Sequence, residues 1–412
     1  MSGERTVAVI GAGAAGAMAA LCAAEAGAEV LLLERTADGG RKILISGGGR
    51  CNVLPSRPDF ARFVTASSPN TMKKMLRAWR LAEQRAFFED TLGIRLALEP
   101  ETGKLFPATD RARDVRDALY TAARTRGAEI RFGQLVTNIT PAVEPRDATP
   151  GWSVVVEHGA DLHADAVVLA TGGLSVPKTG SDGTGLRLAK RLGHTIHRTY
   201  PALTPLTADP PVHAPLAGIS LDVTLEAPLG RGRATTRGGF LFTHRGYSGP
   251  SVLDLSHHAV LSSRDQPILV QWTDADSDAW DHTLRETGAR TVASLVRRRL
   301  PTRLADTLID EAGVHGSRAL AELRRDERRR LVQKLARYPL PWTGDEGYKK
   351  AEVTGGGVAL GEIDPATMES GIAPGLFLCG EILDAFGPIG GYNFMWAWAT
   401  GRAAGLGAAA PR

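Results

Sequence analysis

Cysteine is scarce in this 412-residue chain, which contains only Cys22, Cys51 and Cys379. The three residues are far apart and form no C-x-x-C pair. The sequence therefore excludes a disulfide framework and favours a reducing compartment. No cluster of cysteine and histidine has the spacing of metal ligands, so we expect no bound metal.

Long uncharged runs are also few. Residues 7–24 form the one stretch that approaches a membrane span, with eighteen residues and no charge. This stretch is mostly Ala and Gly, and its Gly-Ala-Gly sequence would break a helix. A strand, a turn and a helix explain it better than a span or a signal peptide. We therefore expect a cytoplasmic protein without a membrane partner.

An excess of one charge sign is confined to one region. The net charge is +4, and residues 281–340 hold fourteen Lys and Arg against eight Asp and Glu. Arg- and Glu-rich helices with solvated faces would explain this balance, and an RNA- or anion-binding patch is the alternative. Aromatic residues hardly interleave with these arginines. We therefore do not expect nucleic acid as a partner.

The N-terminal residues carry a dinucleotide-binding pattern. Residues 6–34 read as a strand, a glycine turn, a helix and a second strand, with glycines that fit G-x-G-x-x-G. Gly11 permits the tight turn, Gly13 lets a pyrophosphate approach the backbone, and Gly16 lets the helix and strand pack closely. The pyrophosphate would meet the N-terminus of the helix, and Glu34 is placed for ribose hydroxyls. An ordinary βα turn is the alternative.

A second glycine-rich string, GGRKILISGGGRCN, occupies residues 39–52. Its cations Arg41, Lys42 and Arg50 suit the dianionic pyrophosphate of FAD. Cys51 either lies near a flavin or packs as a small buried residue. A flavin disulfide reductase would need two closely spaced cysteines, and the string contains one.

The remaining pattern predicts an α/β fold. We expect a Rossmann-like FAD-binding domain of the two-dinucleotide-binding flavoprotein type, with an inserted β-barrel-like domain and a small helical insert. The expected segments are residues 1–195 for the first part of the FAD domain, 196–277 for the β domain, 278–340 for the helical insert, 341–365 for the return through the β domain, and 366–412 for the C-terminal part of the FAD domain.

The C-terminal segment adds a second helix start. A buried strand ends at Gly380 and Glu381, and glycines then lead to an apolar helix. The carboxylate suits ribityl or ribose hydroxyls. The helix N-terminus would favour the negative charge that develops on a flavin ring when it accepts hydride.

Four segments together resemble one bacterial family. They are residues 39–52, the THRGYSGP string at 243–250, AEVTGGGV at 351–358, and the GE, GPIGGYN and AWATG strings from 380 to 401. They resemble the NAD(P)/FAD-dependent flavoproteins of the aminoacetone oxidase and bile-acid-inducible reductase type, over residues 7–405. The resemblance implies non-covalently bound FAD in a Rossmann-like domain with inserted β-barrel and helical units.

The resemblance also implies a set of cofactor-binding residues. They are Gly11, Ala12, Gly13, Ala15, Gly16, Glu34, Arg35, Arg41, Lys42, Ser46, Gly47, Gly48, Gly49, Arg50, Cys51, Asn52, Val136, Ala170, Thr171, Gly172, Gly380, Glu381, Gly390, Gly391, Tyr392 and Asn393.

The expected activity is that of an FAD-dependent oxidoreductase acting on a small molecule held between flavin and inserted domain. Hydride would pass through flavin N5, with His244 and Tyr247 as candidate proton donors. NADH or NADPH as electron donor is implied by the resemblance alone, because the chain has no second G-x-G-x-x-G. The reaction is reduction of an enone-type double bond, or oxidation of an amine or alcohol by oxygen. An FAD-dependent tRNA-modifying enzyme and a non-catalytic flavin-binding sensor or subunit are the alternatives. The sequence leaves the substrate and the oligomeric state open.

Overall fold

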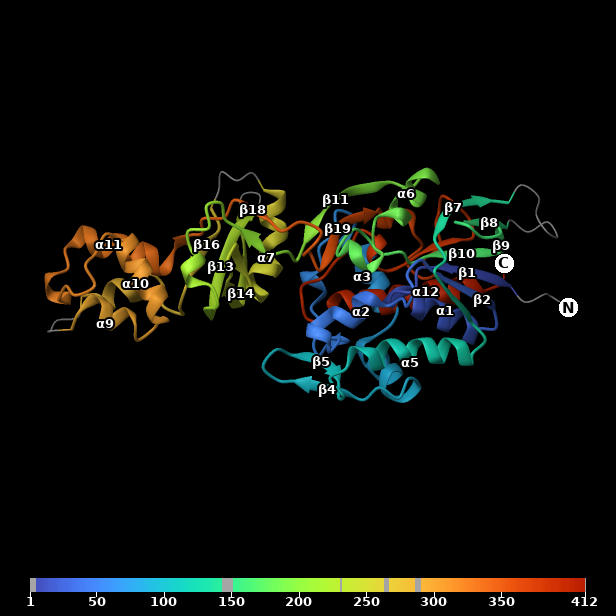
Figure 1. Cartoon of the computed structure of the whole chain (residues 1–412), viewed down its shortest axis with the longest axis horizontal. Coiled ribbons are helices and arrows are strands. Elements are labelled where there is room, and N and C mark those ends of the chain that lie inside the picture. The colour runs from blue at the N-terminus through green and yellow to red at the C-terminus, as the bar shows by residue number, and fades with distance from the viewer. Residues whose placement is uncertain (1–4, 143–150, 230–231, 263–266, 286–289, 412) are drawn as a thin grey trace. The chain divides into compact units, whose positions relative to one another are not determined.

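The computed structural model describes residues 5–142, 151–229, 232–262, 267–285 and 290–411. The chain divides into two compact units (Figure 1). Unit 1 comprises Met1–Pro201 and Glu352–Arg412, and unit 2 comprises Ala202–Ala351.

A five-stranded parallel sheet forms the centre of unit 1. Four of its strands carry short apolar runs that are mostly buried, as expected for a parallel sheet covered on both faces, and the edge strand Glu129–Phe132 is only partly buried. This confirms the predicted α/β class with a Rossmann-type sheet. The order across the sheet is β20 (Leu376–Leu378), β10 (Ala166–Leu169), β1 (Thr6–Ile10), β2 (Glu29–Glu34) and β6 (Glu129–Phe132).

Two helices lie against each other beside this sheet. They are α1 (Ala14–Glu25) and α12 (Tyr392–Ala409), which pack through small residues. A Cβ atom on Gly401 or Gly405 of α12 would overlap the backbone of α1, so glycine permits the close approach. Trp396 and Trp398 then anchor α12 through indole N–H bonds of 3.0 Å to Gly380 O and Val53 O.

The rest of unit 1 consists of further helices and strands around this core. They are α2 (Arg41–Ile45), β3 (Leu54–Pro55), α3 (Pro69–Arg77), α4 (Leu81–Ala86), β4 (Leu96–Glu99), β5 (Lys104–Pro107), α5 (Ala112–Thr125), β7 (Val136–Pro141), β8 (Trp152–Val156), β9 (Leu162–Ala164), α6 (Thr184–Arg191), β11 (Ile196–Ala202) and β19 (Val353–Val358).

Unit 2 combines an antiparallel sheet with helices. Strand order is β17 (Tyr338–Pro339), β16 (Leu269–Gln271), β13 (Ser220–Leu229), β14 (Gly232–Phe242), β15 (Gly246–Ser248), β12 (Leu206–Thr207) and β18 (Gly344–Asp345). The helices are α7 (Pro250–Leu261), α8 (Ser277–Thr283), α9 (Val292–Val296), α10 (Thr302–Glu311) and α11 (Arg325–Ala336). Sheet and helices share one buried apolar cluster, so the helices expected over 278–340 are part of the same unit as the sheet.

The division between the units falls after Pro201 and Ala351 rather than at the expected residues 195 and 365. The reason is that β11 pairs with β19 in a two-stranded sheet. Both strands therefore belong to unit 1, except for Ala202, the last residue of β11, which is assigned to unit 2. Glycines in β19 allow this approach, because a Cβ on Gly355 would overlap the Tyr200 ring.

Within the described ranges, none of the helices combines the length and apolar character that crossing a membrane requires.

Candidate functional site

The glycine turn between β1 and α1 contains two kinds of glycine: those that the packing of the protein requires and one that it does not. Gly11 has φ 100°, and a Cβ there would lie 2.7 Å from Ala170 O. A Cβ on Gly16 would overlap Gly11 O. Gly13 differs, because its φ is −73° and no atom lies within 4 Å of the position its Cβ would take. The space in front of Gly13 is therefore left open by the protein itself.

The first turn of α1 suits an anion. Gly13 is the N-cap, and the turn contains no acidic side chain and no side-chain cap. The N–H groups at a helix start lack intrahelical acceptors and carry the positive end of the helix dipole. Open space and free donors together fit the pyrophosphate of a dinucleotide.

Glu34 holds this turn in place. One carboxylate oxygen accepts a hydrogen bond of 2.8 Å from Ala12 N, and the other accepts bonds of 2.7 Å from Thr36 N and Thr36 Oγ1. Any ribose hydroxyl would share a carboxylate that already shapes the turn. Beside it, Arg35 forms an ion pair of 2.5 Å with Asp182.

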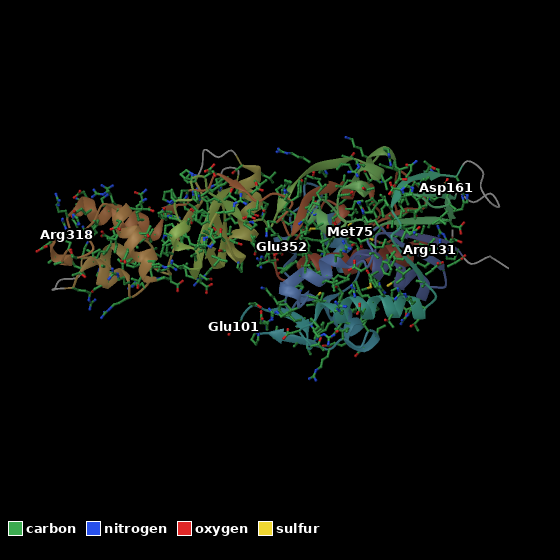
Figure 2. All side chains as sticks on the ribbon, viewed as in Figure 1. Met75, Glu101, Arg131, Asp161, Arg318 and Glu352 are labelled. Carbon is green, nitrogen blue, oxygen red and sulfur yellow. The ribbon has the colours of Figure 1, made fainter. Side chains whose placement is uncertain are left out.

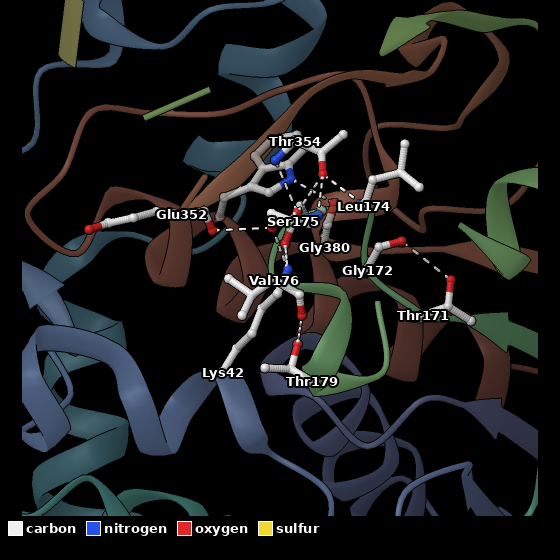
Figure 3. Close-up of polar contacts among 12 residues, drawn as sticks. Lys42, Thr171, Gly172, Leu174, Ser175, Val176, Thr179, Glu352, Thr354 and Gly380 are labelled. Atoms are coloured by element: carbon white, nitrogen blue, oxygen red, sulfur yellow. Dashed lines mark hydrogen bonds and ion pairs between the residues drawn. The ribbon is translucent and has the colours of Figure 1, made fainter. Parts of the chain in front are cut away.

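Four sequence motifs meet in one polar network in unit 1 (Figure 3). Lys42 Nζ on α2 lies 2.6 Å from both Glu381 Oε2 and Ser175 Oγ. Ser175 Oγ lies 2.6 Å from Glu381 Oε1. Thr354 of β19 donates to the same oxygen through N at 3.0 Å and Oγ1 at 2.9 Å. We call these four residues the Lys42–Glu381 network.

The network leaves Lys42 with a donor to spare. Glu381 receives four hydrogen bonds, whereas the Lys42 ammonium has three N–H groups and uses two of them here. The side chains are 25% exposed for Lys42 and 18% for Glu381, so ligand can reach them. The arrangement fits an anionic or hydroxyl-rich cofactor that accepts from Lys42.

Sequence reasoning missed Ser175 and Thr354. Ser175 follows a glycine-rich string and Thr354 lies within another, and both are nearly fully buried. Gly173 makes room for them, because a Cβ there would overlap Thr354 Oγ1 and lie 3.1 Å from Glu381 Oε1. The signal available in the sequence was the glycine itself.

The string at residues 39–52 makes local contacts of its own, and its role in binding a cofactor stays a prediction. Gly47, Gly48 and Gly49 are exposed and have φ of 55°, 70° and 89°, a run that non-glycine residues would resist. Ser46 Oγ donates to Ile43 O. Arg41 pairs with Asp38 at 2.7 Å.

Arg50 makes its contacts with the β4–β5 hairpin, and its role in binding a cofactor stays a prediction. Its guanidinium lies 3.9 Å from the centre of the Phe106 ring and pairs with Glu99 at 3.1 Å. A planar guanidinium gains from stacking and from a carboxylate at once. Arg50 thus ties the string to the β4–β5 hairpin.

At the start of α12, the two side chains that the resemblance assigns to the cofactor form hydrogen bonds with the backbone of the protein. Tyr392 OH accepts from Asp59 N at 3.2 Å, and Asn393 forms two bonds of 2.9 Å with the backbone of Gly387. Gly390 and Gly391 have φ of 105° and 89°. With its side-chain amide oriented so that the oxygen faces Gly391, Asn52 accepts a hydrogen bond of 3.0 Å from Gly391 N. The α12 N-terminus therefore presents backbone rather than side chains.

The strand-end residues lie beside the glycine turn. Ala170 follows β10 and contacts Gly11, and a Cβ on Gly172 would lie 2.8 Å from Ser181 Oγ. Thr171 fills the space beside Gly185. Gly380 faces Ala15, because a Cβ on Gly380 would lie 2.7 Å from the Cβ of Ala15. Val136 begins β7 and is buried in the core.

Cys51 is packed rather than reactive. The residue is fully buried, and burial raises its pKa to about 12, with a hydrogen bond to Ser46 acting in the opposite direction. Burial likewise raises the pKa of Cys22 to about 12 and that of Cys379 well above its ordinary range. All three thiols are therefore neutral and shielded near pH 7.

We expect iodoacetamide to leave all three cysteines unmodified in the native protein at pH 8 and to modify all three after unfolding. Above pH 9 the unfolded chain releases thiol protons that the folded chain retains, so the free energy of unfolding should fall as pH rises. Mass spectrometry of native and unfolded samples checks the first expectation, and rapid labelling of Cys51 in the native protein would contradict it.

The two candidate proton donors lie in unit 2 in very different settings. His244 is exposed between β14 and β15. Tyr247 is fully buried, with its hydroxyl 2.9 Å from His213 Nδ1. The same cluster includes Tyr338 and Glu311.

This cluster is an internal hydrogen-bonded core. Burial opposes ionisation of Glu311, but hydrogen bonds from His213, Lys334 and Tyr338 outweigh it and lower its pKa to about 2. Burial raises the pKa of Tyr247 above its ordinary range. The Tyr247 hydroxyl bonds within this cluster whereas His244 is exposed, and the role of proton donor stays a prediction for both residues.

The parallel sheet, the open glycine turn and the spare Lys42 donor define a dinucleotide-binding protein of the Rossmann class. A family described as "HI0933-like protein Rossmann domain" matches residues 5–407, and the chain belongs to this family.

Two relatives match along nearly their whole length. The chain is 31% identical over 414 residues to a 3-dehydro-bile acid delta(4,6)-reductase of Clostridium scindens, covering 98% of each chain. It is 31% identical over 397 residues to a ribosomal RNA dihydrouridine synthase of Escherichia coli, covering 95% of each.

Solved structures share the fold. An open flavocytochrome c3 fumarate reductase matches with a TM-score of 0.51 at 20% identity, covering 99% of this chain and 78% of the other. A 3-ketosteroid-delta4-(5alpha)-dehydrogenase from Rhodococcus jostii matches with 0.50 at 17%, covering 99% and 97%. The chain is an FAD-dependent oxidoreductase with a Rossmann-type FAD domain.

Proposed function

We propose that this protein reduces a carbon–carbon double bond conjugated to a carbonyl group, with NADH or NADPH as electron donor. The observation that carries the proposal is that two relatives of nearly full length bear names of such reductions. The two delta(4,6) double bonds of a 3-dehydro bile acid are conjugated to its ketone. The carbon–carbon double bond that uridine has and dihydrouridine lacks is conjugated to a ring carbonyl. The two relatives are thus named for substrates that differ, but in both substrates the double bond is conjugated to a carbonyl group.

FAD, when bound, supplies the two electrons as a hydride, and NAD(P)H replaces them. The chain's own residues bind and orient the cofactor. The α1 N-terminus and the space at Gly13 would receive the pyrophosphate, and Lys42 would add a positive charge held in place by Glu381 and Ser175. The α12 N-terminus would favour negative charge on the ring.

A visible spectrum followed by anaerobic titration tests this proposal. We expect one of NADH and NADPH to bleach the flavin bands, and a 3-keto-4-ene steroid or a uridine-containing oligonucleotide to restore them without oxygen. Bleaching by an amine or alcohol, with recovery only in oxygen, would identify an oxidase instead. A flavin that no donor reduces would point to a sensor or partner-fed subunit.

Ribosomal or transfer RNA is a second candidate substrate. The arginine excess in residues 281–340 and the name of the Escherichia coli relative favour it. A small-molecule enone and a uridine differ in size and charge but take the same hydride and proton. The two candidates are separated by which acceptor reoxidises the reduced protein.

We propose His244 as the residue that supplies the proton to the reduced bond. His244→Gln should lower turnover by about 10²- to 10⁴-fold, the usual contribution of a general acid. The visible spectrum and the melting temperature should be unchanged. Flavin reduction by NAD(P)H should also be unchanged, which separates proton supply from hydride supply.

Tyr247→Phe is the matched control for this prediction. It removes the hydroxyl partner of His213 Nδ1 while Tyr338 stays bonded to Nε2, and it should lower the free energy of unfolding by about 1–3 kcal/mol, with turnover retained. Thermal melts and steady-state rates on both variants decide the matter. The assignment of His244 would be wrong if its variant retained full turnover.

A further inference from the structure

Residues 281–340, which include helices α9–α11, the end of α8 and the loops between them, carry more positive charge than their own carboxylates neutralise, with fourteen Lys and Arg against eight Asp and Glu. Asp281 pairs with both Arg285 and Arg328, at 2.5 and 2.8 Å. Glu327 is likewise shared by Arg318 and Arg324, at 2.8 and 3.6 Å. One carboxylate cannot neutralise two guanidinium groups, so each of these clusters retains one positive charge. Figure 2 draws these side chains and labels Arg318.

Helix α11 adds two arginines that form no ion pair with any carboxylate in the described part of the chain. Arg325 and Arg329 are four residues apart, so they lie on one side of the helix, and both are exposed. The side that carries Leu331 and Leu335 is buried. Among the described residues, no carboxylate lies within ion-pair distance of Arg325, Arg329 or the exposed Arg298. We call Arg325 and Arg329 the α11 arginine pair.

The composition of this surface decides between possible anionic partners. The large hydrophobic residues exposed in the described part of unit 2 are Val212, Leu229 and Leu261, all outside helices α8–α11. A helix that lies on a membrane needs exposed apolar side chains beside its cations, and these helices do not offer them. A phosphodiester backbone needs only guanidinium groups.

Trp280 does not offer a base-stacking platform. It is fully buried, and Arg299 lies over its ring at 5.0 Å. The surface therefore suits phosphates rather than bases, and it would bind without reading sequence.

We propose that helices α8–α11 form a docking surface for RNA, with the α11 arginine pair contacting phosphates. This inference rests on the second candidate of the proposed function, because an RNA substrate needs a contact beyond the reacting base. Such a surface would hold a large substrate while the flavin acts on one nucleotide.

Fluorescence anisotropy of the FAD-loaded protein with a labelled hairpin from ribosomal RNA tests the proposal. We expect R325E/R329E to weaken binding about tenfold or more at low salt. Each lost phosphate contact should reduce the slope of log affinity against log salt by about 0.7–0.9. The control R113E/R124E makes the same charge change at exposed positions of α5 in unit 1 and should bind nearly as the unaltered protein does.

Three outcomes would overturn the inference. One is that the unaltered protein fails to bind the hairpin at low salt. Another is that the two double variants weaken binding equally, which would make the effect one of net charge alone. The third is equal binding to vesicles of anionic phospholipid. Flavin reduction by NAD(P)H is measured on the same samples, so loss of RNA binding and loss of the proposed reductase activity are told apart.

Discussion

Gly13→Asp should abolish FAD binding while leaving the cofactor-free protein at least as stable as before. Aspartate is a favoured N-cap residue, and its charge complements the positive end of the α1 dipole, so the helix gains up to about 1 kcal/mol. The same carboxylate fills the open space in front of Gly13 and opposes a dianionic pyrophosphate. We expect the dissociation constant for FAD to rise by about 1,000-fold or more, or roughly 4 kcal/mol.

Two companion variants separate the causes. Gly13→Asn also caps the helix but adds no charge, so it reports the effect of bulk alone. Gly16→Ala should destabilise the cofactor-free protein itself, because its Cβ would overlap Gly11 O. Calorimetric titration with FAD and thermal melts of the apoprotein supply the data. If Gly13→Asp bound FAD with unchanged affinity, the pyrophosphate would not lie at this turn.

Glu381→Ala should have the second large effect, on both cofactor binding and stability. The substitution leaves Lys42, Ser175 and two donors of Thr354 without their shared acceptor. Buried donors that lose their acceptor typically cost about 1–3 kcal/mol, and more when one is charged. We expect FAD affinity to fall by about 100-fold and the free energy of unfolding to fall by a few kcal/mol.

Lys42→Met tests the charge separately. It should weaken FAD binding by about tenfold with a smaller loss of stability, since Glu381 keeps Ser175 and Thr354. Arg41→Met removes the same charge from the same helix, but Arg41 pairs with an exposed aspartate, so little change is expected. Equal effects of the Arg41 and Lys42 variants on FAD affinity would contradict the role given to the Lys42–Glu381 network.

Much of the fold could be read from local patterns. Apolar runs predict the buried strands, and the spacing of glycines predicts the turn before α1. Helices α1 and α12 are predicted because each begins within a few residues of a strand and a glycine turn. Parallel strands need crossover connections, which are usually helices. A buried strand followed by a helix and a second buried strand therefore predicts a parallel sheet. These features depend on neighbours in the sequence, which is why the sequence alone predicts them.

The side-chain partners could not be read in this way. The charge of Arg50 predicts a phosphate ligand, but it does not predict that Arg50 stacks on Phe106. Tyr247 looked available in a polar loop, but its hydroxyl bonds to His213. Ser175 and Thr354 carried no signal of their own. In each case the partner is distant in sequence, and only the packing of several elements decides the pairing.

The Lys42–Glu381 network also bears on how the protein is made. Its members come from positions 42, 175, 354 and 381, so the last of them leaves the ribosome only after most of the chain. Strand β20, which delivers Glu381, joins the sheet at its edge beside β10. Contacts of such high sequence separation form slowly. The cofactor-binding residues of a nascent chain would therefore remain incomplete for most of its synthesis. FAD would then bind at the end of folding and would not guide its start.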